Sequence, residues 1–131
     1  MEYTIKYVCD TLHLTIHTVR HYCDKGLVPN LKYDQHGHRL FDEESLHWLQ
    51  AALFLKESGL SLNEIKHFFD LCLKGEATLE ERKDILIQLK EKAIDDLIKA
   101  KERVTCLEDK IQGCQEALQG LHEDECNPLN W

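Results

Sequence analysis

The chain has 131 residues, of which 43% are hydrophobic and 31% charged, and two are prolines. This length accommodates one compact domain with or without an extended element, and the scarcity of proline argues against long disordered linkers. The N-terminus lacks a basic segment followed by an apolar run, so we expect no signal peptide. No apolar stretch is long enough to cross a bilayer, so we expect a cytoplasmic protein without a membrane partner.

The net charge of −8 is spread unevenly along the chain. Residues 1–40 hold five lysines and arginines against four aspartates and glutamates, whereas residues 76–131 hold eight against fourteen. The acidity therefore belongs to the C-terminal half, and the first forty or so residues could approach a polyanion without strong repulsion. Net charge does not exclude a nucleic-acid partner.

The first 29 residues predict two short helices joined by a tight turn. Thr4 is a suitable N-cap for a helix whose apolar residues share one face, and His13-Leu14 breaks it. Thr15 caps a second helix that runs to about Lys25, where Gly26 is a suitable C′ residue. This arrangement is typical of a helix-turn-helix unit.

Residues 31–41 predict a small hairpin, or wing, because two short runs flank a polar segment that contains Gly37. Asp42 then caps a helix that ends at Gly59, with an inner face of Ser45, Leu46, Leu49, Ala52, Leu53 and Leu55. Ser61 and Glu64 form a capping-box pattern at the start of a further helix, which continues to about Leu73.

The last predicted element is a long helix that begins near Thr78, at a second capping-box pattern, Thr78-Leu79-Glu80-Glu81. Its apolar positions follow a 4-3 spacing over about four heptads, which is the pattern of a coiled coil. A helix of roughly 42 residues spans about 63 Å, more than a head of this size can cover, so we expect a homodimer. The seam residues are Ala93, Leu97, Ala100, Val104, Leu107, Ile111, Cys114, Leu118 and Leu121. Further upstream an added four-residue step at Leu89, Ala93 and Leu97 reads as a stutter.

We therefore expect a mainly α fold: a winged helix-turn-helix head over residues 1–75, a coiled-coil dimerisation helix over residues 76–121, and a short tail over residues 122–131. The long helices are expected to pair as an antiparallel coiled-coil dimer.

The six cysteines contain no C-x-x-C motif, which removes the strongest zinc and redox signatures. In the cytosol their thiols are expected to be reduced, so a disulfide framework is improbable. The chain also lacks a glycine-rich phosphate loop, a patterned Ser/His/Asp arrangement and a paired-carboxylate motif. We predict neither an enzyme nor a bound cofactor or metal.

Several motifs together resemble the MerR family of bacterial transcription regulators. The matching pieces are Tyr3-Thr4-Ile5, Thr18-Val19-Arg20-His21-Tyr22, Lys25-Gly26-Leu27-Val28-Pro29, Gly37-His38-Arg39-Leu40-Phe41 and Gly59-Leu60-Ser61-Leu62-Asn63-Glu64-Ile65. The chain departs from the family pattern at three positions. His21 replaces an aromatic residue, His38 replaces the wing tyrosine, and His13 replaces a glycine in the turn, where a positive φ would be strained.

A helix-turn-helix head places its second helix in the major groove, and Arg20 is suited to bind guanine edges or a phosphate bidentately. The wing and the following helices carry groups suited to phosphate contacts. The predicted DNA-binding residues are Thr15, His17, Thr18, Arg20, His21, Tyr22, Lys32, Tyr33, His38, Arg39, Lys56 and Lys66.

The resemblance also implies a mechanism. A dimer of this family sits on a near-palindromic operator in double-stranded DNA, inside a promoter whose spacer is over-long. An effector signal shifts the dimer so that the DNA is kinked and undertwisted, which realigns the promoter for RNA polymerase. Such a switch acts through the deformation energy of the DNA.

The effector could be a thiol-reactive compound or a metal, or the protein could be a coiled-coil adaptor that binds no DNA. Metal sensors of the family carry a cysteine pair spaced like Cys106 and Cys114. On one helix these sulfurs would lie about 12 Å apart, too far to share an ion, and Cys114 is better explained as a small seam residue. The thiol-stress branch has its signature cysteine near Phe54, where this chain has none, so Cys72 is the possible sensor thiol, although a buried core thiol is the commoner role there. Pairs of histidines at 17 and 21 and at 36 and 38 lack a third ligand.

Overall fold

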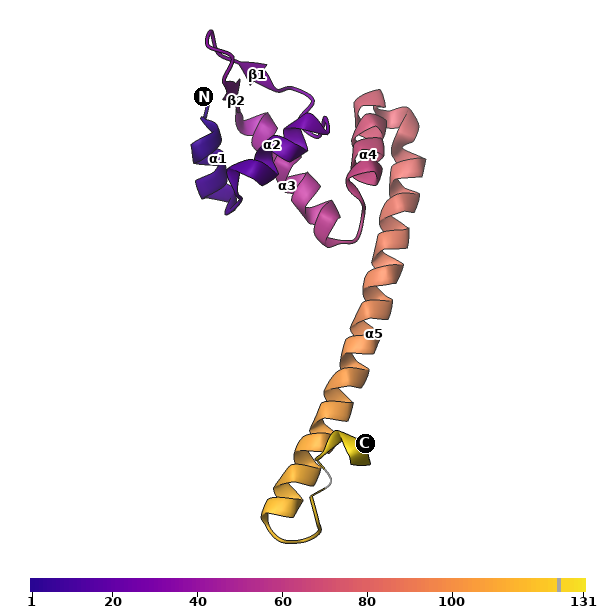
Figure 1. The fold of residues 1–131 in the computed structure, drawn as a ribbon. Helices are drawn as coiled ribbons and strands as arrows, with labels where there is room; N and C mark the ends of the chain where they lie inside the picture. The colour runs from indigo at the N-terminus through magenta and orange to yellow at the C-terminus, as the bar shows by residue number, and fades with distance from the viewer. Residues whose placement is uncertain (125) are drawn as a thin grey trace. The chain divides into compact units, whose positions relative to one another are not determined.

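The computed structural model describes residues 1–124 and 126–131. Nearly all of the secondary structure is helical, and one small antiparallel sheet accompanies it, which confirms the predicted fold class (Figure 1). The chain forms two compact units, Met1–Leu89 and Lys90–Trp131. In chain order the elements are α1 (Ile5–Leu12), α2 (Ile16–Asp24), β1 (Lys32–Tyr33), β2 (Arg39–Leu40), α3 (Glu43–Glu57), α4 (Leu62–Lys74), the short 3-10 helix η1 (Glu76–Thr78), α5 (Leu79–Leu118) and η2 (Pro128–Asn130).

The helix-turn-helix forms as predicted. The Thr4 hydroxyl accepts a hydrogen bond from the amide of Tyr7, and the Thr15 hydroxyl accepts one from the amide of Thr18 at 3.1 Å. Both threonines therefore satisfy amides that the first turn of a helix leaves without partners. Between the helices His13 adopts a left-handed conformation with φ 57° and ψ 44°, which confirms the positive φ expected at this position.

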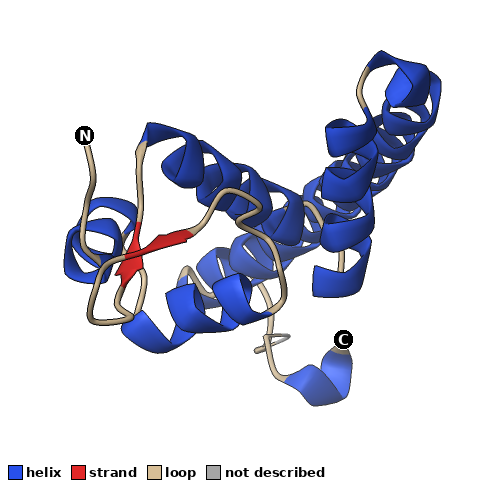
Figure 2. Ribbon diagram, turned by 90° about the horizontal axis from the view of Figure 1, so that it is seen from above, coloured by secondary structure: helices blue, strands red, loops and turns tan. Residues whose placement is uncertain are grey.

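The wing is a two-stranded hairpin in which Lys32 pairs with Leu40 and Tyr33 with Arg39. Its turn is fixed by the Asp34 carboxylate, which accepts hydrogen bonds from the amides of His36 and His38 at 2.8 and 2.9 Å. The sequence did not indicate the further antiparallel bridge between Tyr3 and Phe41, which ties the N-terminal segment to the base of the wing (Figure 2).

Helix α4 begins with the predicted capping box, and α3 begins at the predicted N-cap Asp42, which also forms a capping box with Ser45. In α3 the Asp42 carboxylate accepts the amide of Ser45 at 2.9 Å, and in α4 Ser61 and Glu64 bind each other's backbone amides. The inner face of α3 packs into the core of the head, where Trp48 meets Phe69 edge-on at a ring-centre distance of 4.8 Å. The largest fully buried side chains are Phe41, Phe69, Leu27, Leu49, Ile65, Val8 and Val19.

The expected capping box at Thr78 was wrong. Thr78 is buried, and its hydroxyl donates to the carbonyl of Leu71 at 2.6 Å while it accepts from the Arg82 guanidinium at 3.0 Å. The hydroxyl thus serves the C-terminal end of α4, and α5 continues directly from the η1 turn. Because Ile85 and Leu89 also pack on the core of the head, the first compact unit ends after Leu89, past the boundary that we predicted at residue 75.

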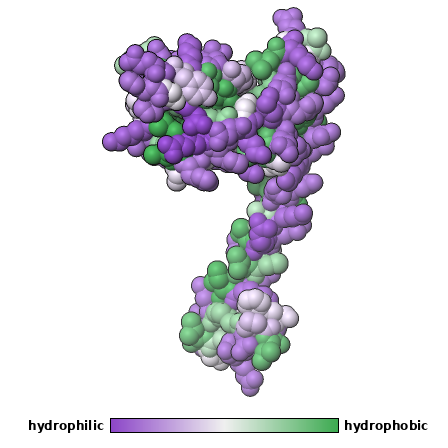
Figure 3. Space-filling view, turned by 45° about the horizontal axis from the view of Figure 1, so that its top comes forward, coloured by the Kyte–Doolittle hydropathy of each residue, from purple (hydrophilic) through white to green (hydrophobic). Residues whose placement is uncertain are grey.

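The second unit contains most of α5 and the C-terminal tail. No residue of α5 is buried, and the large apolar side chains of the predicted seam are exposed: Leu97 by 55%, Val104 by 52%, Leu107 by 59% and Ile111 by 57%. Figure 3 shows apolar side chains on the visible face of this part of the helix. The helix passes through Gly113 without a break, as its heptad pattern predicts.

The tail corrects the expectation that every thiol is free. A disulfide joins Cys114, near the end of α5, to Cys126, while Cys9, Cys23, Cys72 and Cys106 are free. The helix pattern placed Cys114 on the seam, but it carried no information on a tail that turns back along α5.

Candidate nucleic-acid interface

The solvent-facing side of α2 carries polar and basic groups from one end to the other. Thr15, His17, Arg20 and His21 are exposed, and Thr18 is half-buried. The imidazole rings of His17 and His21 lie parallel, with centres 6.4 Å apart, and the hydroxyls of Thr15 and Thr18 share a hydrogen bond of 2.9 Å. The helix therefore presents a row of hydrogen-bonding groups one turn apart, as a helix in the major groove requires.

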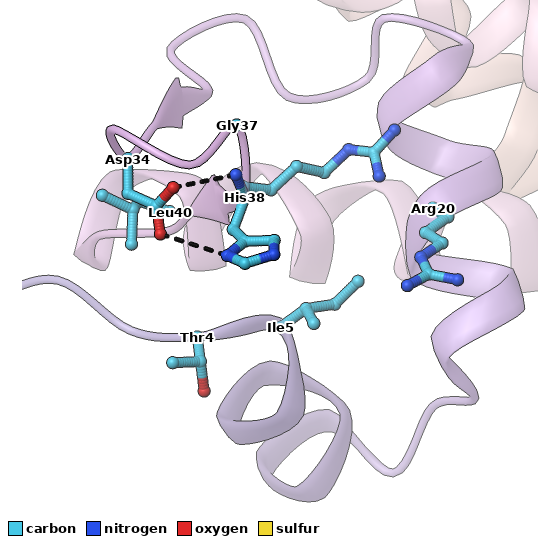
Figure 4. Close-up of a pocket in the computed structure, with 8 residues that line it drawn as sticks. Thr4, Ile5, Arg20, Asp34, Gly37, His38 and Leu40 are labelled. Atoms are coloured by element: carbon cyan, nitrogen blue, oxygen red, sulfur yellow. Dashed lines mark hydrogen bonds and ion pairs between the residues drawn. The ribbon is translucent and has the colours of Figure 1, made fainter.

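Arg20 faces a cleft between the helix-turn-helix and the wing (Figure 4). The cleft has a volume of about 310 Å³, and the residues that line it are Thr4, Ile5, Arg20, Asp34, Gly37, His38, Arg39 and Leu40. Within the described residues Arg20 makes no ion pair, so its guanidinium keeps all its donors for a ligand. Two arginines at one cleft favour an anion such as a phosphate.

The second arginine of the cleft is held by the recognition helix. The guanidinium of Arg39 on β2 bonds the carboxylate of Asp24, the last residue of α2, at 2.7 Å. The Arg39 side chain is 25% exposed, and its Nε is buried without a hydrogen-bond partner among the described residues. Asp24 thus fixes the wing against the end of α2. No sequence pattern links Asp24 with Arg39, so this contact was not predicted.

The remaining wing residues are exposed. Tyr33 is 59% exposed, Lys32 lies 3.6 Å from the Asp42 carboxylate, and the His38 imidazole lies 3.4 Å from that of Asp34. The amide of His38, and then that of His36, lower the pKa of the Asp34 carboxyl group below its usual value. The turn that presents these groups is therefore fixed by an ionised aspartate.

Three predicted residues lie on neither the exposed face of α2 nor the wing. Tyr22 is packed in the core of the head and is 7% exposed, which leaves little of its surface for DNA. Lys66 is half-buried and paired with Asp70, and its stem fills the space beside Gly26, where any Cβ would lie 2.9 Å from Lys66 Cε. Lys56 is exposed in the last turn of α3.

The base of the wing contains a polar network that sequence reasoning missed. The Asn30 amide donates to the Asp42 carboxylate at 2.9 Å, and the buried Ser45 hydroxyl also binds that carboxylate at 3.0 Å. The Ser45 amide, followed by the Asn30 side chain, lowers the pKa of Asp42 to about 2. The sequence predicted Asp42 as an N-cap but not its bond with the Ser45 hydroxyl. Asn30 lies twelve residues before Asp42, and no local signal links them.

The cysteines do not assemble a metal site in the parts of the chain that the structure describes: no group of three or more His, Cys, Asp or Glu side chains converges there. The hypothetical pair Cys106 and Cys114 is not formed, because Cys114 is bonded to Cys126 and Cys106 is exposed and free. Cys72 is half-buried on α4. Burial raises the pKa of Cys9, and it raises that of Cys23 to about 11, so both thiols are poor nucleophiles.

Residues 3–72 match the family described as "MerR HTH family regulatory protein". The chain is a member of the MerR family. An HTH-type transcriptional regulator of Haemophilus influenzae is 31% identical over 89% of this chain and 87% of its own length. The transcriptional regulator AdhR of Bacillus subtilis is 32% identical over 70% of this chain and 65% of its own length. These relatives are regulators and not enzymes, which confirms the prediction that the chain has no catalytic role.

Solved structures of the family share the fold. A MerR-family regulator that lacks a sensor domain, HiNmlR, was solved on promoter DNA; it is 30% identical, with a TM-score of 0.80 over 91% of this chain and 94% of that one. A MerR-family regulator of Bacillus thuringiensis is 32% identical, with a TM-score of 0.75 over 86% of this chain and 98% of that one. The described residues contain no helix long and apolar enough to cross a membrane.

Proposed function

We propose that this MerR-family regulator acts in the cytoplasm as a homodimer that binds a near-palindromic operator in double-stranded DNA. The observation that carries the proposal is the arginine cleft between α2 and the wing, with the Arg20 guanidinium left without a protein partner in the described residues. The HiNmlR structure supports it, because a protein of the same fold and length is bound there to promoter DNA.

In this proposal α2 enters the major groove and the wing contacts the backbone. The N-cap Thr15, and His17 and Thr18 in the first turn of α2, approach the base edges, as helix N-terminal residues do in helix-turn-helix proteins. Arg20 binds a guanine edge or a phosphate, and His21 follows on the same side. Lys32, Tyr33, His38, Arg39 and Lys56 contact phosphates that set the register.

The predicted DNA-binding residues are not all equally free to contact DNA. Lys66 would have to leave Asp70 to reach a phosphate, and Tyr22 supports α2 from the core instead of contacting DNA. Arg39 shares its charge with Asp24, so its contribution to phosphate binding is smaller than that of Arg20. Asp24 acts as a positioning residue that holds the wing arginine beside the cleft.

The exposed seam of α5 supports the dimer. At least four large apolar side chains lie half-exposed along one stripe of α5. Fully burying such a side chain lowers the free energy by about 1.5 to 3 kcal/mol relative to leaving it in water. A second α5 would cover Ala93, Leu97, Ala100, Val104, Leu107, Ile111, Cys114 and Leu118, and an antiparallel pairing would bring two heads to one duplex.

The proposed regulatory step follows from two heads joined by one coiled coil. A shift in the pairing of the helices would move both heads at once and would bend and undertwist the DNA between them. At a promoter with an over-long spacer, this distortion would bring the two promoter elements into register for RNA polymerase.

A gel-shift titration with DNA from upstream of the protein's own gene tests DNA binding, with a scrambled duplex of equal length as the control. We expect specific binding whose affinity falls steeply with salt, because phosphate contacts release counterions. Arg20→Ala should weaken specific binding about 10- to 100-fold. Lys74→Ala, an exposed lysine at the end of α4, is the matched control and should change little. Equal binding of both duplexes, unaffected by Arg20→Ala, would contradict the proposal, and no binding of either duplex would support the adaptor role.

A further inference from the structure

The C-terminal tail is folded back along the last turns of α5. The Trp131 indole N–H donates to the Cys126 carbonyl at 3.1 Å, and the Lys110 ammonium lies 5.0 Å from the centre of the indole ring. The Cys126 sulfur also lies 3.5 Å from the carbonyl oxygen of Lys110. These contacts, all within the second unit, place Cys126 beside the helix.

The disulfide between Cys114 and Cys126 closes this arrangement. The two Cα atoms lie 5.6 Å apart, within the usual range for disulfides, and twelve residues separate them in sequence. The other four cysteines of the chain are free, so the bond is not part of a cross-linked framework. It joins one helix end to one tail, and the head has a core that does not depend on it.

The bond lies within reach of small reagents. Cys114 and Cys126 are each half-buried, and they line a surface hollow of about 430 Å³ together with Ala117, Leu118 and Asp124. Disulfides that solvent can reach are the ones that exchange readily with thiols, whereas fully enclosed ones resist reduction.

The tail covers a face of α5 that borders the dimer seam. Lys110, Gly113, Cys114 and Ala117 are half-buried at helical spacing, whereas Ile111 and Leu118 of the seam remain 57% and 88% exposed. Cys114 belongs to both faces. The tail therefore leaves most of the seam open to a second chain, and it is bonded to Cys114 at the edge of the seam.

We propose that Cys114 and Cys126 form a redox modification site, at which a peroxide or a low-molecular-weight disulfide reversibly fastens the tail to α5. The site goes beyond DNA binding and operates in the second unit alone. Because Cys114 lies on the border of the seam, closing or opening the bond changes the surface that α5 presents to a partner helix.

The chemistry balances with hydrogen peroxide as the oxidant. One thiolate attacks a peroxide oxygen and forms a sulfenic acid as hydroxide leaves and takes up a proton to become water. The second thiol then attacks the sulfenic sulfur, forming the S–S bond and releasing a second water. Two electrons pass from the two sulfurs to the peroxide. A dithiol reductant returns both thiols by exchange and is itself oxidised to its disulfide.

The first test is performed on the full chain without DNA. The reduced protein is treated with hydrogen peroxide, its remaining thiols are blocked with maleimide, and the peptides are mapped by mass spectrometry. We expect a cross-linked peptide containing Cys114 and Cys126, about 2 Da lighter than the two thiol forms, that disappears with dithiothreitol. Cys114→Ser and Cys126→Ser should abolish it, whereas Cys106→Ser, a free exposed cysteine on the same helix, should not.

The second test measures the tail itself. Carboxypeptidase should release Trp131 about tenfold more slowly from the oxidised chain than from the reduced chain, and Cys126→Ser should remove this difference. A bond that joins Cys106 or a second chain instead, a release rate indifferent to oxidation, or a bond that excess dithiothreitol leaves intact would each overturn the proposal. None of these readouts uses DNA, so their outcome is independent of the operator-binding experiment.

Discussion

The two compact units differ in how completely they bury their own apolar surface. The head encloses a core in which Phe41, Leu49 and Ile65 are 0% exposed, and its helices begin at side-chain caps. The long helix buries none of its residues, and the large seam side chains from Leu97 to Leu118 are more than half exposed. The head thus buries its apolar surface within one chain, whereas α5 leaves an apolar stripe exposed, which the proposed dimer would cover.

The largest expected effect concerns the head alone. Phe41→Ala removes the side chain that joins the wing, the N-terminal bridge and the core, and it should lower the free energy of unfolding by about 3 to 5 kcal/mol. Urea unfolding followed by Trp48 fluorescence, in a Trp131→Phe background, measures this change. A loss below about 1 kcal/mol would mean that the core of the head is not continuous through Phe41.

The next effect concerns the seam. Ile111→Asp places a charge in the predicted interface between helices and should raise the dimer dissociation constant about 100-fold, measured by sedimentation. Thr105→Asp adds the same charge to an exposed position outside the seam and should leave the constant unchanged. In a Trp131→Phe background, the urea midpoint reported by Trp48 should be the same in the Ile111→Asp and Thr105→Asp variants. If Ile111→Asp also unfolds the head, the stability of the head depends on the pairing of α5.

A smaller effect depends on pH. The pKa of Asp42 is lowered to about 2 in the folded chain, below the ordinary value near 3.9, so ionised Asp42 stabilises the fold above about pH 4. This stabilisation is lost as the pH falls from about 4 towards 2. Asp42→Asn keeps a good N-cap but does not titrate, so its urea midpoint should fall less over this range than that of the unchanged protein. Parallel pH profiles for the two proteins would contradict this account of the wing base.

The smallest expected effect is at the turn between α1 and α2. His13 holds a left-handed conformation that costs a residue with a Cβ roughly 1 kcal/mol, so His13→Gly should raise the stability of the head by about 0.5 to 1 kcal/mol. His13→Ala keeps the Cβ and should give no such gain. If both variants respond alike, the cost arises from the imidazole and not from the backbone.

Most helices and turns of the head were predicted because helix caps and turn residues act on their immediate neighbours in sequence. Thr4, Thr15, Asp42 and Ser61 each cap the helix that their spacing indicated, and Gly37 lies in the turn of the wing. The same kind of pattern failed at Thr78, where a matching capping box competes with a tertiary contact: the buried hydroxyl is drawn to the carbonyl of Leu71.

The candidate site was predicted less completely because its geometry depends on contacts between distant segments. The exposure of Arg20 followed from the helix period, but the ion pair of Arg39 with Asp24 and the bond of Asn30 with Asp42 join residues with no sequence pattern between them. Tyr22 shows the converse: its position beside Arg20 suggested a DNA contact, whereas burial places it in the core. The tail contact of Cys114 with Cys126 likewise had no periodic signal.

The most direct measurement of the central claim is the native mass of the chain by sedimentation equilibrium over a range of concentrations. We expect a species of twice the chain mass of 15.3 kDa that persists to low micromolar concentration and dissociates in Ile111→Asp. A chain that remains at 15.3 kDa at every concentration would contradict it, because the exposed seam of α5 would then have no partner helix.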